Sequence, residues 1–319
     1  MRYVPLLFLI IILAACNGGT ADHRPEPAHV VPLYKEIAGG NISATDSTEL
    51  KAFMLTVSDL PLSPELIEAW SASKVVAVFT PDVDSVFTDT MYVAGRLGEI
   101  LHRAIDKRLP LPHRRYATVV YGRPESILFV DSVMLIALNH YLGADYPGYS
   151  HWPSYMRQTK TIQSLPYDMA EALVATSYPY TLEGEDDTAL ARMIYHGVLA
   201  TIRQQLVPGS NRADALGYTP EQLKWLEDNE RNLWHSLIGQ QLLYDTSSAT
   251  IDKLVSPSPS TGILSPDAPG RAGRYIGYRI VCAYINKYPD TTISEMLSPD
   301  FYRGNRTLID SQYQGQGSR

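Results

Sequence analysis

Apolar residues recur with helical spacing over much of this chain. Between Asp89 and Arg108 they fall on one face of a helix, and Pro110 follows where that helix must stop. Two segments, Ser63-Pro64-Glu65 and Thr219-Pro220-Glu221, combine a capping hydroxyl, a proline and a glutamate in the order that begins a helix. The pattern predicts helices in the first third and throughout the second half. Those of the second half are expected at Tyr167–Thr176, Asp187–Leu206, Thr219–Tyr244, Ser247–Val255 and Gly270–Tyr288.

Between these helical regions the pattern changes to short apolar runs of the kind found in β-strands. Tyr116–Tyr121 and Ile127–Val130 are separated by a Gly-Arg-Pro-Glu turn, which predicts a hairpin or two strands of one sheet. A further apolar run, 133–138, follows. No repeat period and no internal linker are visible in the body. We therefore expect a single α+β domain, predominantly helical with a small sheet, over residues 33–319.

The first residues have the pattern of an export signal. Arg2 precedes an apolar run from Val4 to Ala15, which is shorter than the roughly 20 residues that a membrane-spanning helix needs. The run ends in Leu13-Ala14-Ala15-Cys16, the pattern of a bacterial lipobox. We predict a lipoprotein signal peptide at 1–15, lipid attachment at Cys16, and a flexible tether rich in Gly and Pro at 16–32. The alternative is an ordinary signal peptide with an incidental cysteine.

Lipidation would fix the location of the protein. Acyl chains on Cys16 would hold a water-soluble domain on a membrane and leave Cys282 as the remaining thiol. Asn17 follows the cysteine in place of the aspartate that marks inner-membrane retention in enteric bacteria. The expected location is the cell envelope, at the outer membrane and facing the periplasm.

Composition and motifs exclude several classes of protein. The 319 residues are 45% hydrophobic and 19% charged, as in ordinary globular chains, and the net charge of −7 opposes binding to nucleic acid. The chain has neither an HExxH zinc motif nor a Walker loop. The segment Gly148-Tyr149-Ser150-His151-Trp152 lacks the closing glycine of a nucleophile elbow. We assign no catalytic residue, no metal ligand and no cofactor.

One polar cluster in the sequence nevertheless deserves a structural test. His140, Asp145 and His151 lie close together in the chain, and Glu171 follows on the next predicted helix. These residue types can form a metal or acid–base site. The alternative is that they pack and hydrogen-bond a long ordered loop rich in tyrosine.

Four segments of the chain resemble one known family. They are Tyr141–Tyr149 (YLGADYPGY), Met193–Gly197 (MIYHG), Gly217–Trp225 (GYTPEQLKW) and Ser265–Gly277 (SPDAPGRAGRYIG). Together with the lipobox, they are similar to the gliding-motility lipoprotein B (GldB) family of Bacteroidetes. The resemblance implies a cell-envelope lipoprotein associated with gliding and with type IX secretion. Its partners would be other envelope, secretion or motility proteins, in addition to the membrane reached through the lipid.

A more distant similarity is to predicted zinc peptidases. Their HExxH motif would lie on the helix that contains Asp168 to Leu173, where this chain has neither histidine. The similarity implies a zincin-like but non-catalytic relative whose groove still binds polypeptide.

The last of the four segments also has a physical interpretation. Asp267 is placed to cap the following helix, and small residues allow another element to approach closely. Two arginines three positions apart can pair with carboxylates, and they serve either the fold or a partner. The residues of this motif are Asp267, Gly270, Arg271, Gly273, Arg274 and Gly277.

These observations favour a lipoprotein that acts through protein–protein interaction and not through catalysis. Two alternatives remain open at this point. One is a metal-dependent, peptidase-like hydrolase with an atypical site, and the other is a periplasmic lipoprotein that binds a ligand.

Overall fold

The computed structural model describes residues 25–40 and 47–315, and its centre is a small mixed sheet. The strands lie in the order β1-β2-β4-β3; β1, β2 and β4 are parallel, and β3 is antiparallel to β4. The expected signal peptide and the expected lipid-attachment residue Cys16 lie outside the described residues. The strands are β1 (Val30–Val31), β2 (Arg115–Val119), β3 (Ile127–Val130) and β4 (Val133–Ala137).

Both faces of the sheet are buried. Along β4, Met134 and Ile136 join one hydrophobic cluster while Leu135 joins the other, so successive side chains point to opposite faces. Strands covered on both faces read as continuous apolar runs. This explains why the run 133–138, which was not assigned as a strand from the sequence, forms the centre of the sheet.

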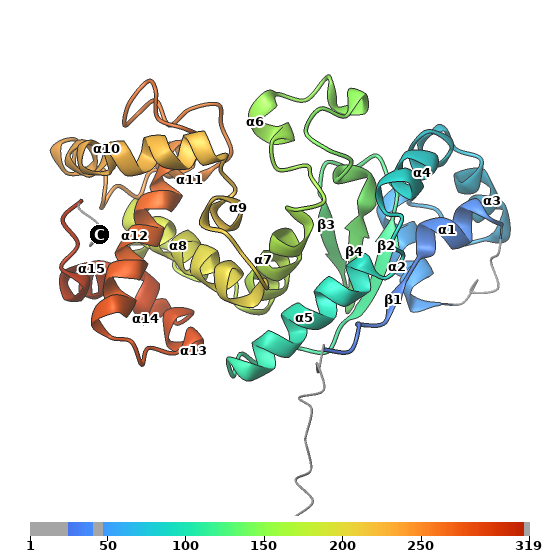
Figure 1. The fold of residues 1–319 in the computed structure, drawn as a ribbon, viewed down its shortest axis with the longest axis horizontal. Coiled ribbons are helices and arrows are strands. Elements are labelled where there is room, and N and C mark those ends of the chain that lie inside the picture. The colour runs from blue at the N-terminus through green and yellow to red at the C-terminus, as the bar shows by residue number, and fades with distance from the viewer. Residues whose placement is uncertain (1–24, 41–46, 316–319) are drawn as a thin grey trace, which may run out of the picture.

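Helices of the first third cover the sheet from both sides (Figure 1). Leu33, Phe53 and Ile67, from the first three helices, pack on one face, and Leu97 packs on the other. The Ser63 hydroxyl accepts a hydrogen bond from the Leu66 amide, which confirms the predicted cap of α3. These helices are α1 (Leu33–Ala38), α2 (Thr48–Val57), α3 (Pro64–Ser71), α4 (Lys74–Val86) and α5 (Tyr92–Asp106).

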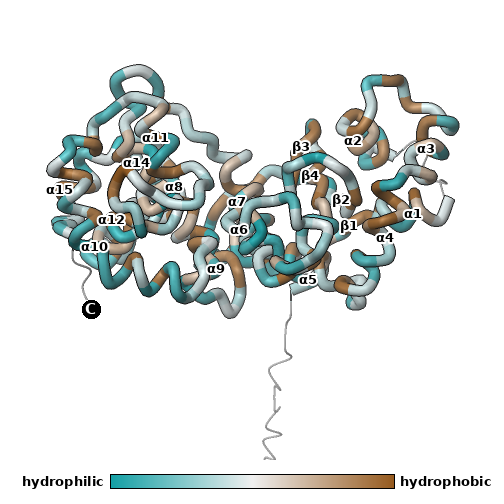
Figure 2. The backbone as a smooth tube through the Cα atoms, turned by 90° about the horizontal axis from the view of Figure 1, so that it is seen from above, coloured by the Kyte–Doolittle hydropathy of each residue, from teal (hydrophilic) through white to brown (hydrophobic). Residues whose placement is uncertain are grey.

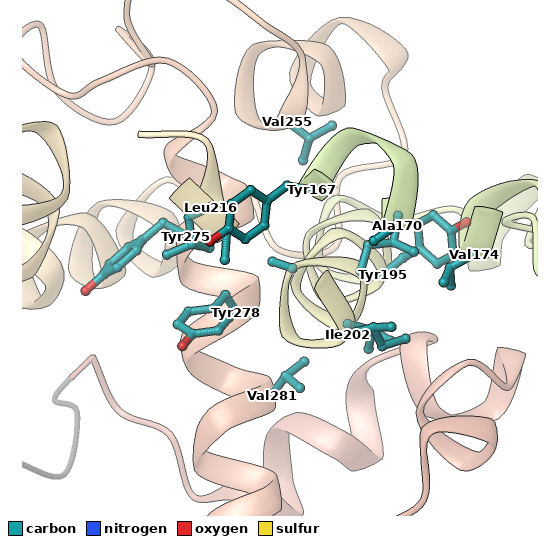
Figure 3. Close-up of a cluster of buried hydrophobic side chains, with 14 of the residues drawn as sticks. Tyr167, Ala170, Val174, Tyr195, Ile202, Leu216, Val255, Tyr275, Tyr278 and Val281 are labelled. Atoms are coloured by element: carbon teal, nitrogen blue, oxygen red, sulfur yellow. The ribbon is translucent and has the colours of Figure 1, made fainter. Parts of the chain in front are cut away.

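The second half is a helical assembly in which α8 and α12 cross closely. Gly197 and Gly277 meet at the crossing, where a Cβ on either would overlap the backbone of the other helix. Figure 3 shows the buried side chains around it, with Tyr195 from α8 and Val281 from α12. The main helices are α7 (Leu165–Ser177), α8 (Ala189–Leu206), α9 (Arg212–Leu216), α10 (Pro220–Gly239), α11 (Ser248–Val255) and α12 (Ala272–Lys287). Shorter ones are α6 (Ser154–Arg157), α13 (Ile293–Met296), α14 (Pro299–Tyr302) and α15 (Asn305–Ser311).

The predicted helices are present, and one of them ends earlier than expected. Thr219 forms a capping box with Gln222 at the start of α10, as the sequence indicates. The helix stops at Gly239 because Gln241 adopts a left-handed conformation, with φ of 58°, and the Leu242 amide bonds back to the Leu237 carbonyl. This termination normally uses glycine, so a glutamine in its place gave no signal in the sequence.

The packed body begins earlier than expected. Val30–Val31 forms β1 beside β2, and the Ala28 amide donates to the Ala94 carbonyl at 2.9 Å. These residues lie within the stretch 16–32 that was expected to be a tether. A two-residue strand is too short to produce a periodic pattern in a segment rich in Gly and Pro.

The fold is therefore the expected predominantly helical α+β fold, with fifteen α-helices in the described part of the chain. Nothing in that part supports the zincin-like component of the expectation. The helix expected to correspond to the zinc-binding helix is α7, and its carboxylates face an arginine of α8.

Candidate functional site

Two carboxylates on α7 face a buried arginine on α8. Arg203 donates from Nη1 to Oε2 of Glu171 at 2.6 Å, and its Nη2 lies 3.7 Å from Oδ1 of Asp168. The Tyr141 hydroxyl donates to Asp168 at 3.0 Å. The Arg203 side chain is 10% exposed, whereas those of Asp168 and Glu171 are 32% and 28% exposed. We call these four residues the junction cluster, because they connect the end of the sheet with α7 and α8.

The two carboxylates respond differently to this environment. Burial alone would raise the pKa of Glu171, but the Arg203 guanidinium, with Arg274 and His196 nearby, lowers it below the ordinary value. Burial raises the pKa of Asp168, and Arg203 and Lys160 offset that effect only in part. Glu171 is consequently the member of the pair held firmly in its charged form.

The two arginines of the motif at 267–277 connect helix ends. Arg271 donates to the Gly217 carbonyl at 2.6 Å, at the C-cap of α9, and Arg274 donates to the Val255 carbonyl at the end of α11. Carbonyls at helix C-termini favour cations. In these contacts both arginines serve the fold, which was one of the two roles considered for them.

The predicted cap at Asp267 is wrong. Asp267 is exposed, and α12 begins after Arg271 without a side-chain cap from that residue. The buried Thr261 hydroxyl instead accepts a hydrogen bond from the Ala272 amide at 2.9 Å and donates to the Pro269 carbonyl at 2.7 Å. A cap supplied from eleven residues earlier leaves no local pattern in the sequence.

The glycines of the motif do allow close approach, as predicted. A Cβ on Gly270 would meet the Ser258 carbonyl, and one on Gly273 would lie 2.8 Å from the Leu254 carbonyl oxygen. Gly277 faces the Met193 carbonyl on α8. The three glycines therefore bring α12 and the turn before it against three different segments.

His140 lies in a buried polar contact. Its Nδ1 is 3.3 Å from the Ser126 hydroxyl, which also contacts the Lys160 ammonium, and its ring lies edge-on to Trp152. Burial, with a smaller contribution from Lys160, lowers the pKa of His140 to about 3. The imidazole is therefore neutral at physiological pH.

The four residues of the expected polar pocket do not converge. Asp145 and His151 are exposed, and Glu171 is engaged by Arg203. The surrounding loop is instead ordered by its aromatic residues: the Tyr149 hydroxyl donates to the Asn139 carbonyl at 2.6 Å, and its ring stacks on Trp152. In the described residues no group of three or more His, Cys, Asp or Glu side chains is arranged to hold a metal ion.

Arg203, Ser126 and Lys160 are not among the site residues predicted from the sequence. Arg203 had a usable signal, since it follows a run of buried apolar residues on α8 and an arginine there requires an acidic partner. Ser126 and Lys160 had none, because they are 34 residues apart and meet only through the fold.

The outer strand β3 has an open apolar edge. The Ala137 amide donates to the Ser126 carbonyl, which makes these two residues a hydrogen-bonded pair. In an antiparallel pair of strands every second residue forms such a pair, so Leu128 and Val130 also bond to β4. The residues between them, Ile127 and Phe129, direct their backbone amides and carbonyls away from β4. Among the described residues no hydrogen bond reaches these outward groups. All four side chains of the strand are half-buried, and β3 lies at the outer margin of the sheet (Figure 2).

The comparison with protein families identifies the chain. The model of the family described as gliding motility protein GldB matches residues 50–315. The chain belongs to the GldB family. No curated protein and no solved structure matches it. GldB membership supports a gliding-motility-associated lipoprotein of the cell envelope, as the four segments indicated.

The body of this GldB-family chain contains no helix that is both long and apolar enough to cross a bilayer, within the residues that the structure describes.

Proposed function

We propose that this GldB-family lipoprotein acts by binding an extended polypeptide segment of an envelope partner, and not by catalysis. The open edge of β3 carries this proposal. A strand edge with free amides and carbonyls is a template on which another chain can add as a further strand.

The composition of β3 supports a binding role for that edge. Natural sheets protect their edges with lysine, proline or bulges, whereas β3 reads Ile-Leu-Phe-Val. Its partner would be an extended segment with apolar residues, which would continue the two hydrophobic faces of the sheet beyond β3.

The junction cluster supports the same proposal in a different way. Glu171 and Asp168 are engaged by Arg203 and Tyr141, and His140 has a pKa too low for it to carry a proton at neutral pH. General acid–base catalysis needs groups with a pKa near the working pH. These side chains are better suited to holding the sheet and α7 in place behind β3.

A proline at the edge tests the β3 proposal. The Ile127 amide points outward, so Ile127→Pro removes a hydrogen-bond donor from the edge without breaking the hydrogen bonds between β3 and β4. Ile127→Ala is the control, because it removes the same side chain and keeps the amide donor. We expect Ile127→Pro to weaken binding of envelope partners identified by cross-linking and mass spectrometry about tenfold, and Ile127→Ala to change it much less.

Calorimetry with the purified partner measures the binding, and thermal unfolding shows that both variants fold. Equal binding by the proline and alanine variants would contradict the proposal that the partner binds at the β3 edge.

The proposed anchor is a lipid on Cys16, in the outer membrane and facing the periplasm. We expect Cys16→Ala to abolish lipid attachment, to remove the protein from the outer-membrane fraction, and to impair gliding or secretion. Fractionation, mass spectrometry of the N-terminal peptide and a spreading assay measure these effects. Full activity of an unlipidated chain would contradict the anchor.

A further inference from the structure

The chain enters the body along α5, in the direction opposite to that helix. The Ala28 amide bonds to Ala94, and the carbonyl of Glu26 lies against Gly98, one turn further along α5. Earlier residues of the chain thus meet later residues of the helix. The start of the described chain therefore points toward the C-terminal end of α5, as Figure 1 shows.

That end of α5 is unusually basic for an acidic protein. We call this surface the basic face; it is formed by the C-terminal turns of α5 and the segment that follows, up to the first residue of β2. The net charge of the whole chain is −7. The cations of the basic face are Arg103, Lys107, Arg108, Arg114 and Arg115.

Two of these cations project without a partner. Lys107 and Arg108 are exposed, and neither forms an ion pair or side-chain hydrogen bond with another described residue. Arg108 has a φ of 54°, and the Leu109 amide bonds back to the Ala104 carbonyl, so Arg108 occupies the left-handed position that glycine favours at a helix end. An arginine there is conformationally costly.

The other charged residues of this surface lie close to groups of opposite charge or to backbone carbonyls. Arg115 pairs with Glu49 at 3.0 Å, and Asp106 lies 3.6 Å from His102. Asp290, from the end of the helical half, lines a hollow shared with Lys107 and Arg108. Glu26, beside Gly98, and Asp131, whose carbonyl accepts a hydrogen bond from Arg114, are two further exposed acidic residues here, so the unpaired positive charge of this surface is that of Lys107 and Arg108.

Apolar groups lie among the cations. Ile105 is 73% exposed. Beside it is a hollow of about 460 Å³ lined by Leu101, Leu109 and Leu111, with Arg114 among its other residues. Basic side chains around exposed apolar ones are typical of surfaces that rest on a lipid headgroup layer.

We propose that the basic face lies against the anionic headgroups of the membrane that anchors the protein. The proposal rests on the proposed lipid at Cys16. Residue 25 lies nine positions after Cys16. Nine peptide steps span at most about 30 Å even when the chain is fully extended. Because residue 25 lies beside the basic end of α5, so short a connection to a lipid on Cys16 would keep the basic face closer to the membrane than the other surfaces of the body.

A vesicle experiment with the intact protein tests this contact. The chain purified from cell membranes is incorporated into vesicles of phosphatidylcholine, with or without phosphatidylglycerol, and hydrogen–deuterium exchange is followed in the peptide 102–115. We expect exchange there to slow about threefold or more only when phosphatidylglycerol is present, and this protection to disappear at high salt.

The double variant Lys107→Glu/Arg108→Glu should lose this protection. Its control, Arg231→Glu/Lys253→Glu, makes the same charge change at exposed positions of α10 and α11, far from the end of α5 (Figure 1). Equal exchange in both kinds of vesicle, or equal loss in both variants, would overturn the proposal.

Retention of the protein on vesicles of phosphatidylcholine alone tests the lipid anchor independently of the basic face. If the protein is not retained there, the anchor is absent, and the basic face is then measured by binding of the same preparation to vesicles containing phosphatidylglycerol. In that case Lys107→Glu/Arg108→Glu should weaken binding about tenfold or more relative to the control variant, and equal binding would overturn the proposal.

Discussion

Gly277→Ala is expected to lower the free energy of unfolding by about 3 kcal/mol or more, because α8 and α12 cross with almost no space between their backbones. A Cβ at Gly277 would overlap the carbonyl of Met193, and the neighbouring Gly197 lies directly against Gly277 itself. The obstructing atoms are backbone atoms, so no rotamer change can relieve the overlap. One helix would have to move away from the other and open the cluster shown in Figure 3.

Gly239→Ala is the matched control for this prediction. Gly239 is the last residue of α10, and a Cβ there would meet nothing within 4 Å. Alanine favours the helix by up to about 1 kcal/mol, so this variant should be as stable as the natural chain or slightly more stable. Urea unfolding followed by circular dichroism compares the two. If Gly277→Ala unfolds at the same urea concentration as Gly239→Ala, the helices do not cross as described.

Arg203→Met should destabilise the protein by about 3 kcal/mol at neutral pH, toward the lower end of the range for breaking a buried ion pair. Methionine fills similar space but leaves Glu171 and Asp168 facing each other without their cation. The carboxylates keep roughly a third of their exposure, so water compensates part of the loss. Arg231→Met, at an exposed position of α10, should have almost no effect.

The loss caused by Arg203→Met should shrink as the pH falls. In the natural chain the pKa of Glu171 is lower in the folded state than in the unfolded state. The charged carboxylate therefore stabilises the fold fully at a pH above the ordinary carboxyl pKa. This stabilisation is lost as the pH falls through the lower pKa of the folded state. Without Arg203, burial would raise the pKa of both carboxyls, so protonation would favour the folded variant. Urea unfolding at pH 7 and near pH 4 measures the difference. A gap that widens in acid would contradict the role of Arg203.

The helix caps and close-packed glycines show why sequence patterns succeed for some features and fail for others. The caps at Ser63 and Thr219 were predicted correctly, because donor and acceptor lie within three residues of each other. The cap of α12 was assigned to Asp267 because that residue is near the helix, whereas the fold uses Thr261. The glycines before and within α12 were interpreted correctly as points of close approach, but their neighbours were unknown.

The candidate site divides in the same way. The sequence placed Glu171 on a helix, and that placement is correct. It grouped Glu171 and His140 with Asp145 and His151 because they are close in the chain, whereas the fold leaves the last two exposed. Arg203 is 32 residues from Glu171 and is its hydrogen-bond partner. Closeness in sequence was therefore a poor guide to which charges meet.

The sequence by itself determined the main helices of the second half, the strand at 127–130 and the family, because each is carried by spacing or motif within a few tens of residues. The export pattern at the N-terminus stays a prediction. Only the tertiary structure decided that Ile127–Val130 is an open edge, that Arg203 holds the carboxylates of α7, and that the chain leaves beside the basic end of α5. The physical reason is the same in each case: these features depend on which distant segments pack together, and packing is set by the burial of the whole core and not by any local pattern.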